Sequence, residues 1–291
     1  MVKNWHLLAL LVLLLSLSSR VGAADEFFDS NGIKIRYVTE GKGEPIVLLH
    51  GWMSDSSMWG RLDTNPAAKE FQLIAVDLRG HGKSDKPHEP EKYGPEMTED
   101  VVRLLNHLKL PKAHLVGYSM GVYVASLVAA KHPDRVLSLV YGGQAPLFAG
   151  TLKADGHEVE AFAKAVDAGK GLGSYLIEVT PPDKPKLGLE QANAITAMLY
   201  KDKDVKAYAA AGRSFKNFGV TNDELKACKA PILFIHGSKE AESTKERAAA
   251  IVKLLGRGEI KVIEGGDHMT TLAKPAFGKS IDEFIKANKQ K

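Results

Sequence analysis

Cysteine is almost absent from this sequence, since Cys228 is the only one among its 291 residues. No disulfide can therefore form within the chain, and we expect the fold to depend on a hydrophobic core. The metal-binding patterns H-E-x-x-H and C-x-x-C do not occur. The glycine-rich stretch at 169–173 is not a phosphate loop, because its lysine is misplaced and no strand precedes it. We therefore expect neither a metal nor another cofactor.

Dense blocks of one charge are also missing, and the 39 basic residues nearly balance the 35 acidic ones. Proteins that bind nucleic acid usually gather basic residues in a patch or stripe. The short basic end of the chain, residues 286–291, is interpreted as a solvated terminus. We therefore expect no nucleic-acid partner.

Long hydrophobic runs are limited to the beginning of the sequence. Lys3 precedes a leucine-rich run at 7–17, and small residues follow at 18–23. This order is typical of a secretory signal peptide, and the run is short compared with the roughly 20 helical residues that span a bilayer. We therefore predict a signal peptide at 1–23 and a secreted or periplasmic protein without stable membrane insertion. An uncleaved membrane anchor is the alternative.

After this segment, apolar strands alternate with amphipathic helices. Ile33, Ile35 and Tyr37 alternate with polar residues after a turn at 31–32, as in a half-exposed strand. The later strands are continuous apolar runs, which are typical of strands buried on both faces. This order predicts an α/β fold with a mostly parallel central sheet and helices on both faces. Strands are expected at 45–49, 71–76, 113–117, 136–141, 231–235 and 260–263, and helices at 57–69, 96–108 and 122–131.

The alternation stops between residues 144 and 222. Helical patterns occur there at 157–168, 189–201 and 204–215, without a clear buried strand. We interpret 144–222 as a helical cap inserted over the carboxyl ends of the strands, where open α/β sheets bind ligands. The core would then comprise 24–143 and 223–291. A second independent domain is less favoured, because about 79 residues rich in alanine and lysine would form a thin core.

Residues 117–121 read Gly-Tyr-Ser-Met-Gly and join an expected strand to an expected helix. A G-x-S-x-G turn in this setting is the pattern of a nucleophile elbow, with Ser119 as the nucleophile. Glycine suits the positions two residues before and after the serine, since strand and helix pass close together there. The turn would force Ser119 into a strained backbone conformation that exposes its hydroxyl.

A serine hydroxyl needs a base to take its proton and an acid to orient that base. With such an elbow, the acid and then the histidine follow the serine along the chain. Of the ten histidines, only His268 lies beyond every candidate acid, in a glycine-containing loop after the last expected strand. His268 is therefore the candidate base, and a solvated loop histidine is the alternative.

Five stretches together resemble the α/β-hydrolase superfamily, in particular its lidded group of small esterases, haloperoxidase-like enzymes and carbon–carbon bond hydrolases. They cover the mature chain except for the expected cap. The stretches are His50-Gly51-Trp52, residues 77–84 (DLRGHGKS), residues 117–121 (GYSMG), residues 132–136 (HPDRV) and the loop around His268.

The resemblance implies an oxyanion hole made by two backbone N–H groups, those of Trp52 and Met120. It also implies structural roles for His50 and His81. Haloalkane dehalogenases and epoxide hydrolases of this fold use an aspartate as nucleophile. A serine at this position instead implies acyl transfer through an acyl-serine intermediate.

The candidate acid departs from the family pattern. Similar sequences carry Gly-x-x-Asp after the strand expected at 231–235, whereas this chain carries Glu240 at the aspartate position. Glutamate has the same carboxylate on a longer side chain, so Glu240 is the first candidate. Glu242 is the second, Asp267 adjoins His268, and the alternative family position at 141–144 contains no acid.

These observations predict an exported serine hydrolase that cleaves small-molecule carboxylic esters with Ser119, His268 and Glu240. A perhydrolase or a carbon–carbon hydrolase with the same residues is the alternative among enzymes. A non-catalytic binding protein on a hydrolase fold is the alternative from another class, because fold alone does not determine function.

Overall fold

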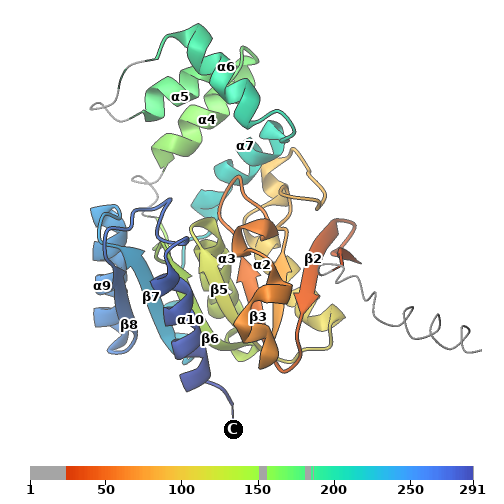
Figure 1. Cartoon of the computed structure of the whole chain (residues 1–291), viewed down its shortest axis with the longest axis vertical. Helices are drawn as coiled ribbons and strands as arrows, with labels where there is room; N and C mark the ends of the chain where they lie inside the picture. The colour runs from red at the N-terminus through yellow and green to blue at the C-terminus, as the bar shows by residue number, and fades with distance from the viewer. Residues whose placement is uncertain (1–23, 151–155, 181–184, 186, 291) are drawn as a thin grey trace, which may run out of the picture.

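The computed structural model describes residues 24–150, 156–180, 185 and 187–290, so the predicted signal peptide lies outside the described residues. Within them, the chain forms an eight-stranded sheet in the order β1-β2-β4-β3-β5-β6-β7-β8 (Figure 1). The β1–β2 and β2–β4 pairs are antiparallel, and every other neighbouring pair is parallel. The fold class predicted from the alternation of strands and helices is therefore confirmed. The strands are β1 Glu26–Asp29, β2 Lys34–Glu40, β3 Glu44–Leu49, β4 Phe71–Val76, β5 Ala113–Tyr118, β6 Val136–Gly142, β7 Ile232–Gly237 and β8 Glu259–Ile263.

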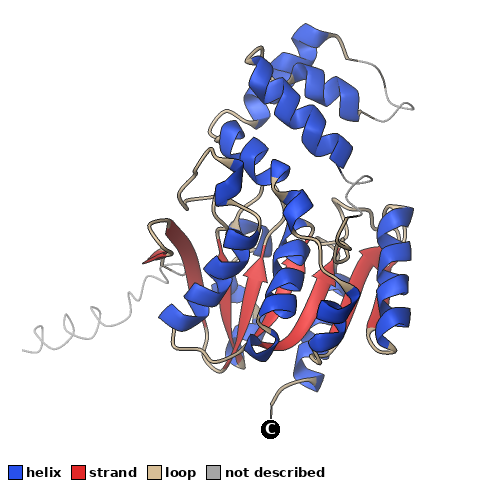
Figure 2. Cartoon of the chain, turned by 180° about the vertical axis from the view of Figure 1, so that it is seen from behind, coloured by secondary structure: helices blue, strands red, loops and turns tan. Residues whose placement is uncertain are grey.

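The central strands β3 to β7 are buried on both faces, whereas four of the five residues of the edge strand β8 are exposed. Alternate residues of β3 belong to two different cores, because successive side chains of a strand point to opposite faces. Val47 and Leu49 pack with the helices of one face, and Ile46 and Leu48 with those of the other. Figure 2 shows helices in front of the sheet on the face turned to the viewer. The helices are α2 Pro95–His107, α3 Met120–Lys131, α8 Asn222–Ala227 and α9 Glu242–Leu255 on the first face, with α10 Pro275–Ala287 on the second.

The helix predicted at 57–69 is wrong. Three short 3₁₀ segments occupy this stretch instead, η1 Ser56–Trp59, η2 Leu62–Thr64 and η3 Pro66–Lys69. Gly60 ends η1 with a positive φ of 72°, which a continuous right-handed helix does not allow. Pro66 lacks an N–H and would remove a hydrogen bond from a longer helix. Apolar residues of this stretch do face the core, since Leu62 and Ala67 are buried. Gly60 and Pro66 nevertheless prevent a continuous helix.

Four helices stand over one end of the sheet (Figures 1 and 2). They are α4 Gly156–Ala168, α5 Gly173–Val179, α6 Leu189–Leu199 and α7 Val205–Arg213, and we refer to them as the cap helices. Phe162, Tyr175 and Tyr208 form a small core between α4, α5 and α7. Ala210 and Ala211 of α7 instead belong to the main core between the sheet and the helices of its first face. α7 therefore connects the cap helices to the sheet.

The helix α5 was missed by sequence analysis, which expected helices in this part of the chain only at 157–168, 189–201 and 204–215. Gly173 is the first residue of α5, and Tyr175 packs edge-on against Phe162 of α4 with ring centroids 5.1 Å apart. This helix of seven residues is too short to be stable in isolation, so its packing on α4 is what stabilises it. None of the helices in the described part of the chain has both the length and the apolar character to cross a membrane.

Candidate active site

Ser119 lies on a sharp turn between β5 and α3, with φ 53° and ψ −117°. It is one of four non-glycine residues with positive φ among those described. Such a conformation costs about 1–3 kcal/mol. A Cβ on Gly117 would collide with the carbonyl of Gly121, and a Cβ on Gly121 with the carbonyl of Leu49. The two glycines therefore allow strand and helix to approach closely enough to hold this strained turn.

The side chains of Ser119, His268 and Glu240 lie together in one chain of hydrogen bonds. The Oγ of Ser119 is 3.0 Å from Nε2 of His268, and Nδ1 of His268 is 3.2 Å from Oε1 of Glu240. An ionised carboxylate only accepts hydrogen bonds, so Nδ1 of His268 is the donor to Glu240. Nε2 is then free to accept the hydroxyl proton of Ser119. The O–H of Tyr118 donates to the backbone carbonyl of His268 at 2.7 Å and holds the loop in place.

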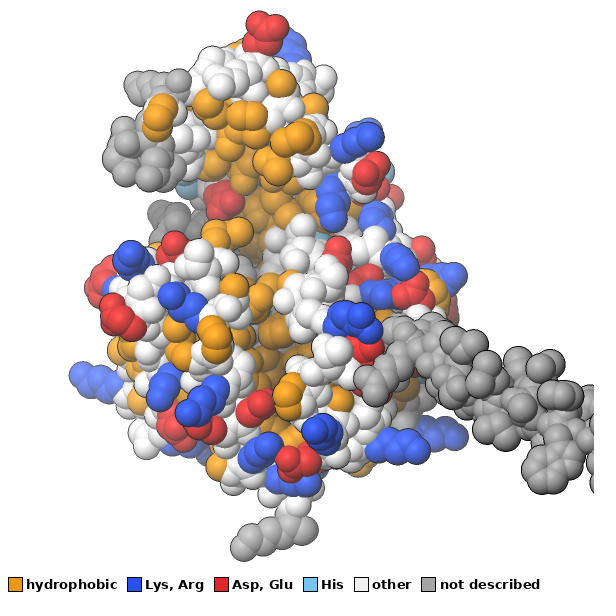
Figure 3. Space-filling view, in the orientation of Figure 1, with side chains coloured by type: hydrophobic (Ala, Val, Ile, Leu, Met, Phe, Trp, Pro, Cys, Tyr) orange, Lys and Arg blue, Asp and Glu red, His pale blue; other side chains and the backbone are white. Residues whose placement is uncertain are grey.

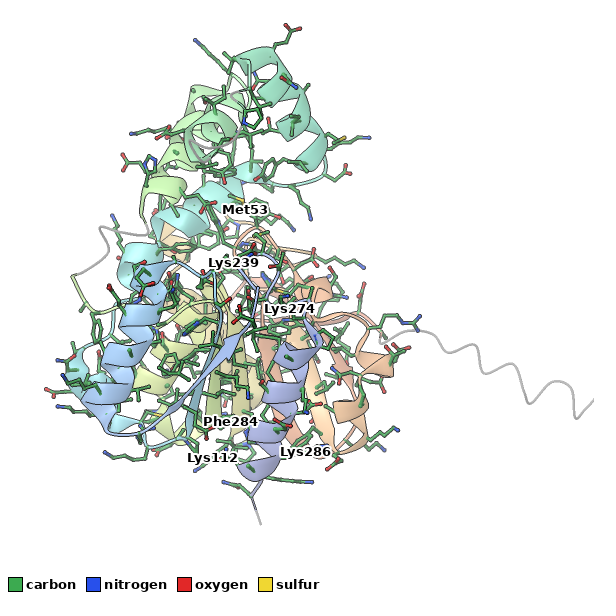
Figure 4. The ribbon with its side chains drawn as sticks, turned by 60° about the vertical axis from the view of Figure 1, so that its left-hand side comes forward. Met53, Lys112, Lys239, Lys274, Phe284 and Lys286 are labelled. Atoms are coloured by element: carbon green, nitrogen blue, oxygen red, sulfur yellow. The ribbon has the colours of Figure 1, made fainter. Side chains whose placement is uncertain are left out.

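Glu240 is the candidate acid that lies against His268. Its side chain is only 3% exposed, and Oε1 also accepts the N–H of Ala241. The two alternative acids are engaged elsewhere. Glu242 is 70% exposed and pairs with Lys245 at 2.6 Å, while Asp267 accepts hydrogen bonds from the backbone of its own turn. Figure 4 labels Lys239, the residue before Glu240, at the end of the sheet nearest the cap helices.

Burial and neighbouring charges shift the pKa of His268 in opposite directions. Burial lowers the pKa of His268, but the hydrogen bond and charge of Glu240, with a further contribution from the charge of Glu158, outweigh burial. The net result is a pKa above the ordinary value of 6.5. The site thus stabilises the protonated form of His268 more than water does, which helps a base that must carry a proton during a reaction.

Trp52 and Met120, the two candidate oxyanion residues, line the same cavity as Ser119. Met120 is the first residue of α3, where backbone N–H groups have no partner within the helix. The loop after β3 passes beside Ser119, since a Cβ on Gly51 would lie 3.8 Å from its Oγ. The ring of His50 donates to the carbonyl of Gly51 at 2.7 Å and accepts the N–H of Leu78 at 3.0 Å, which braces this loop.

The side chain of Trp52 joins the core to the cap helices. Its indole N–H donates to the carbonyl of Tyr208 on α7 at 2.9 Å. Its ring packs edge-on against Phe162 of α4 and Phe215, with centroids 5.3 and 5.7 Å away. Met53, the next residue, is labelled in Figure 4 at the boundary between the sheet and the cap helices. The side chain of Trp52 therefore anchors the loop after β3 to α4, to α7 and to Phe215.

A cavity of about 700 Å³ opens over Ser119 and His268, between the sheet and the cap helices. Figure 3 shows the molecule hollowed in this region, with apolar side chains inside. Among the described residues that line it, Glu158 and Glu178 come from the cap helices, and there is no lysine or arginine. A second cavity of about 380 Å³ near α4 and α7 contains none of Ser119, His268 and Glu240. The chemistry therefore belongs to the larger cavity.

Comparison with known proteins identifies the family. A family model described as "alpha/beta hydrolase fold" matches residues 44–275. The chain belongs to the α/β-hydrolase family. An epoxide hydrolase from Caballeronia sordidicola is 26% identical over 255 residues, which are 87% of this chain and 74% of the relative. Two acetyltransferase components of acetoin cleaving systems match over only 31% and 26% of their own length.

Solved structures have the same α/β-hydrolase fold. A carboxylesterase structure from Nitrososphaera gargenis has a TM-score of 0.73 at 20% identity and covers 91% of this chain and 98% of its own. A bromoperoxidase from Bacillus anthracis has a TM-score of 0.72 at 24% identity and covers 90% and 100%. At these identities the likeness shows the fold alone, and the family match supports a hydrolase.

Sequence analysis of this α/β-hydrolase missed the polar residues that other elements bring to the cavity. Glu158 lies in the first turn of α4, Gln144 follows β6, and Thr244 lies on α9. No local pattern distinguishes these residues from ordinary surface or capping residues, because only the packing of distant elements makes them neighbours of Ser119. No group of His, Cys, Asp or Glu side chains within the described ranges could hold a metal ion.

Proposed function

We propose that this α/β-hydrolase is an exported serine hydrolase that cleaves carboxylic esters through an acyl-serine intermediate. The observation that carries the proposal is the chain of hydrogen bonds from Ser119 to His268 and on to Glu240, at 3.0 and 3.2 Å. This arrangement has the nucleophile, base and orienting acid within the reach that proton transfer needs. Its place in a cavity of about 700 Å³ leaves room for a small ester.

The reaction would begin when Oγ of Ser119 attacks the ester carbonyl and its proton moves to Nε2 of His268. The backbone N–H groups of Trp52 and Met120 would hold the negative oxygen of the tetrahedral intermediate. His268 would then give its proton to the departing alcohol, which leaves an acyl group on Ser119. A water molecule, deprotonated by His268, would attack that acyl group and release the acid, with the proton returning to Ser119.

The serine nucleophile favours ester cleavage over epoxide opening, even though a relative at 26% identity is an epoxide hydrolase. Epoxide hydrolases of this fold form their intermediate on an aspartate, and this chain carries Ser119 there. A serine-reactive phosphonate probe with peptide mass analysis tests the proposal, with label expected on Ser119. A protein that neither reacts with the probe nor hydrolyses esters would instead be a binding protein. Parallel assays with an ester, a peracid and a vinylogous diketone separate ester hydrolysis from the other serine-dependent reactions.

The charge of the cavity predicts a preference for neutral esters. Glu158, held by the O–H of Tyr175 at 2.9 Å, and Glu178 would repel a substrate carboxylate. Each exposed pair of like charges costs about 1 kcal/mol at 4 Å in water. We expect kcat/KM for ethyl hexanoate to exceed that for the monoethyl ester of adipic acid by about tenfold, and the difference to shrink in high salt.

Glu158→Gln should reduce this preference for the neutral ester, because it removes a charge and keeps the shape. Glu160→Gln is the matched control, since Glu160 lies on the same helix, pairs with Lys164 and does not line the cavity over Ser119. Equal rates for the two esters in the unmodified protein, or equal effects of both variants, would contradict this prediction.

Export is the other untested part of the proposal. Lys3, the leucine-rich run and the small residues before Ala24 motivate it. N-terminal sequencing of periplasmic or secreted protein should begin at Ala24 or Asp25. An intact Met1 on soluble cytoplasmic protein would remove export from the proposal and leave the hydrolase assignment unaffected.

A further inference from the structure

Gln144 lies beside the candidate catalytic residues without a role in the reaction described above. It follows β6 by two residues, and β6 lies between β5, which leads to Ser119, and β7, which leads to Glu240. Gln144 lines the same cavity as Ser119 and His268. Gln144 is partly exposed, so its side chain is available to a molecule bound in this cavity.

The orientation of the Gln144 amide is determined by its neighbours. Its Oε1 accepts hydrogen bonds from the N–H of Ala145 at 3.0 Å, from Oγ1 of Thr244 at 3.1 Å and from the guanidinium of Arg247. A backbone N–H and a guanidinium can only donate, so the atom that they share must be the amide oxygen. The amide nitrogen therefore points away from these three donors.

The amide nitrogen of Gln144 has no hydrogen-bond partner within the described residues, yet it is not among their buried unpaired polar atoms. It is therefore accessible, and the space next to this residue is the cavity over Ser119. Three hydrogen bonds immobilise the amide before a substrate binds, which reduces the entropy lost on binding. The positive charge of Arg247 on the oxygen further polarises the amide and strengthens its N–H groups as donors.

The order of the strands indicates which part of an ester would meet Gln144. The loop of Trp52 follows β3, on one side of the Ser119 strand, and Gln144 follows β6, on the other side. The β6 side is also that of His268, whose loop follows β8. Because His268 must deliver a proton to the departing alcohol, the alcohol portion belongs on this side.

We propose that Gln144 is a specificity-determining residue that donates an N–H to an acceptor oxygen in the alcohol portion of the substrate. The substrate class is thereby narrowed to esters whose alcohol carries an ether, hydroxyl or carbonyl oxygen. This inference rests on the proposed serine ester hydrolase function.

Two esters with the same acyl group and nearly the same shape test this role. Butyl butanoate and 2-methoxyethyl butanoate differ by an oxygen in place of a methylene. The unmodified protein should favour the methoxyethyl ester by about 3- to 10-fold in kcat/KM, the range that one hydrogen bond gives. Gln144→Leu should abolish that preference mainly by raising KM for the methoxyethyl ester, since the lost bond is present in both the ground and transition states.

Gln144 also ties α9 to the end of β6, so a purely structural role must be separated from substrate binding. A structural role would lower kcat for both esters equally and leave their ratio unchanged. Arg247→Lys is the matched control, because Arg247 donates to the amide oxygen without lining the cavity, and the variant retains the amide N–H groups of Gln144. Thermal unfolding of both variants monitors the loss of packing, and only Gln144→Leu should change the ester ratio.

Three other outcomes would contradict the proposed role of Gln144. If the unmodified protein hydrolyses both esters equally, the role of Gln144 is wrong while ester hydrolysis stands. If a preference appears instead between butyl 3-methoxypropanoate and butyl pentanoate, which differ in the acyl group, the assignment to the alcohol is wrong. If neither ester is hydrolysed and a phosphonate does not label Ser119, the proposed function fails, and the inference fails with it.

Discussion

If the proposed function is right, Ser119→Ala is expected to lower kcat for ester hydrolysis by about 10⁶-fold, as loss of the nucleophile does in a serine protease. The variant cannot form the acyl-serine intermediate. Only the oxyanion donors and substrate binding would remain, and these alone sustain weak catalysis. The measurement is the steady-state rate with a neutral short-chain ester, together with mass analysis after phosphonate treatment.

The control for this variant is Ser126→Ala on the same helix, α3. Ser126 is buried, and its hydroxyl donates to the carbonyl of Tyr123 at 2.9 Å, away from His268. Its replacement should retain phosphonate labelling and most of the activity. Ser119→Ala itself should keep the fold, because it removes only the hydroxyl oxygen and adds no atom that could collide with the turn. Full esterase activity in folded Ser119→Ala would overturn the proposed function.

Glu240→Gln is expected to lower kcat by about 10²–10⁴-fold. The amide keeps the shape of the side chain but removes the charge that stabilises protonated His268 and holds its Nδ1–H. Neutral His268 is the active form, so activity falls as the pH drops through its pKa. Because Glu240 helps to raise that pKa above 6.5, the acidic limb of kcat/KM should move to lower pH in the variant while the plateau falls. A pH–rate profile of both proteins measures both effects.

Glu242→Gln is the matched control for the acid, since Glu242 is two residues away and pairs with Lys245. It should leave both the plateau and the acidic limb almost unchanged. Glu240→Asp tests whether the loop depends on the longer side chain. If the site requires the reach of glutamate, the shorter acid should also lower activity. A near-normal rate in Glu240→Gln with a large loss in Glu242→Gln would transfer the role to Glu242.

Much of the fold was predictable because the determinants of its elements are local. Continuous apolar runs predicted the buried strands β3, β4, β6 and β7, and the sheet confirms them. The G-x-S-x-G turn was equally informative, since its two glycines answer a steric requirement that any strand–turn–helix elbow imposes. By contrast, three short η segments replaced the helix expected at 57–69, where Gly60 and Pro66 overrode the apolar spacing.

Some residues of the candidate site were likewise predictable from the sequence, and others were not. Ser119 and His268 were predicted from a motif and from chain order, and the structure places their side chains 3.0 Å apart. Glu240 was predicted because it stands where similar sequences carry an aspartate, and its catalytic role stays a prediction. Glu158 and Gln144 carried no such signal. Their importance to the cavity depends on which elements pack over β5 and β6, and residues far apart in the chain become neighbours only after that packing.

The sequence by itself therefore determined the alternation of strands and helices, the elbow at Ser119 and the order of its candidate partners. These features depend on side-chain periodicity and backbone sterics over a few residues. The tertiary structure decided the separation between Ser119, His268 and Glu240, the charge of the cavity and the direction of the Gln144 amide. Those properties depend on distances between segments more than 100 residues apart, such as Gln144 and Arg247. Local preferences cannot specify such distances, because they result from the packing of the whole sheet against its helices.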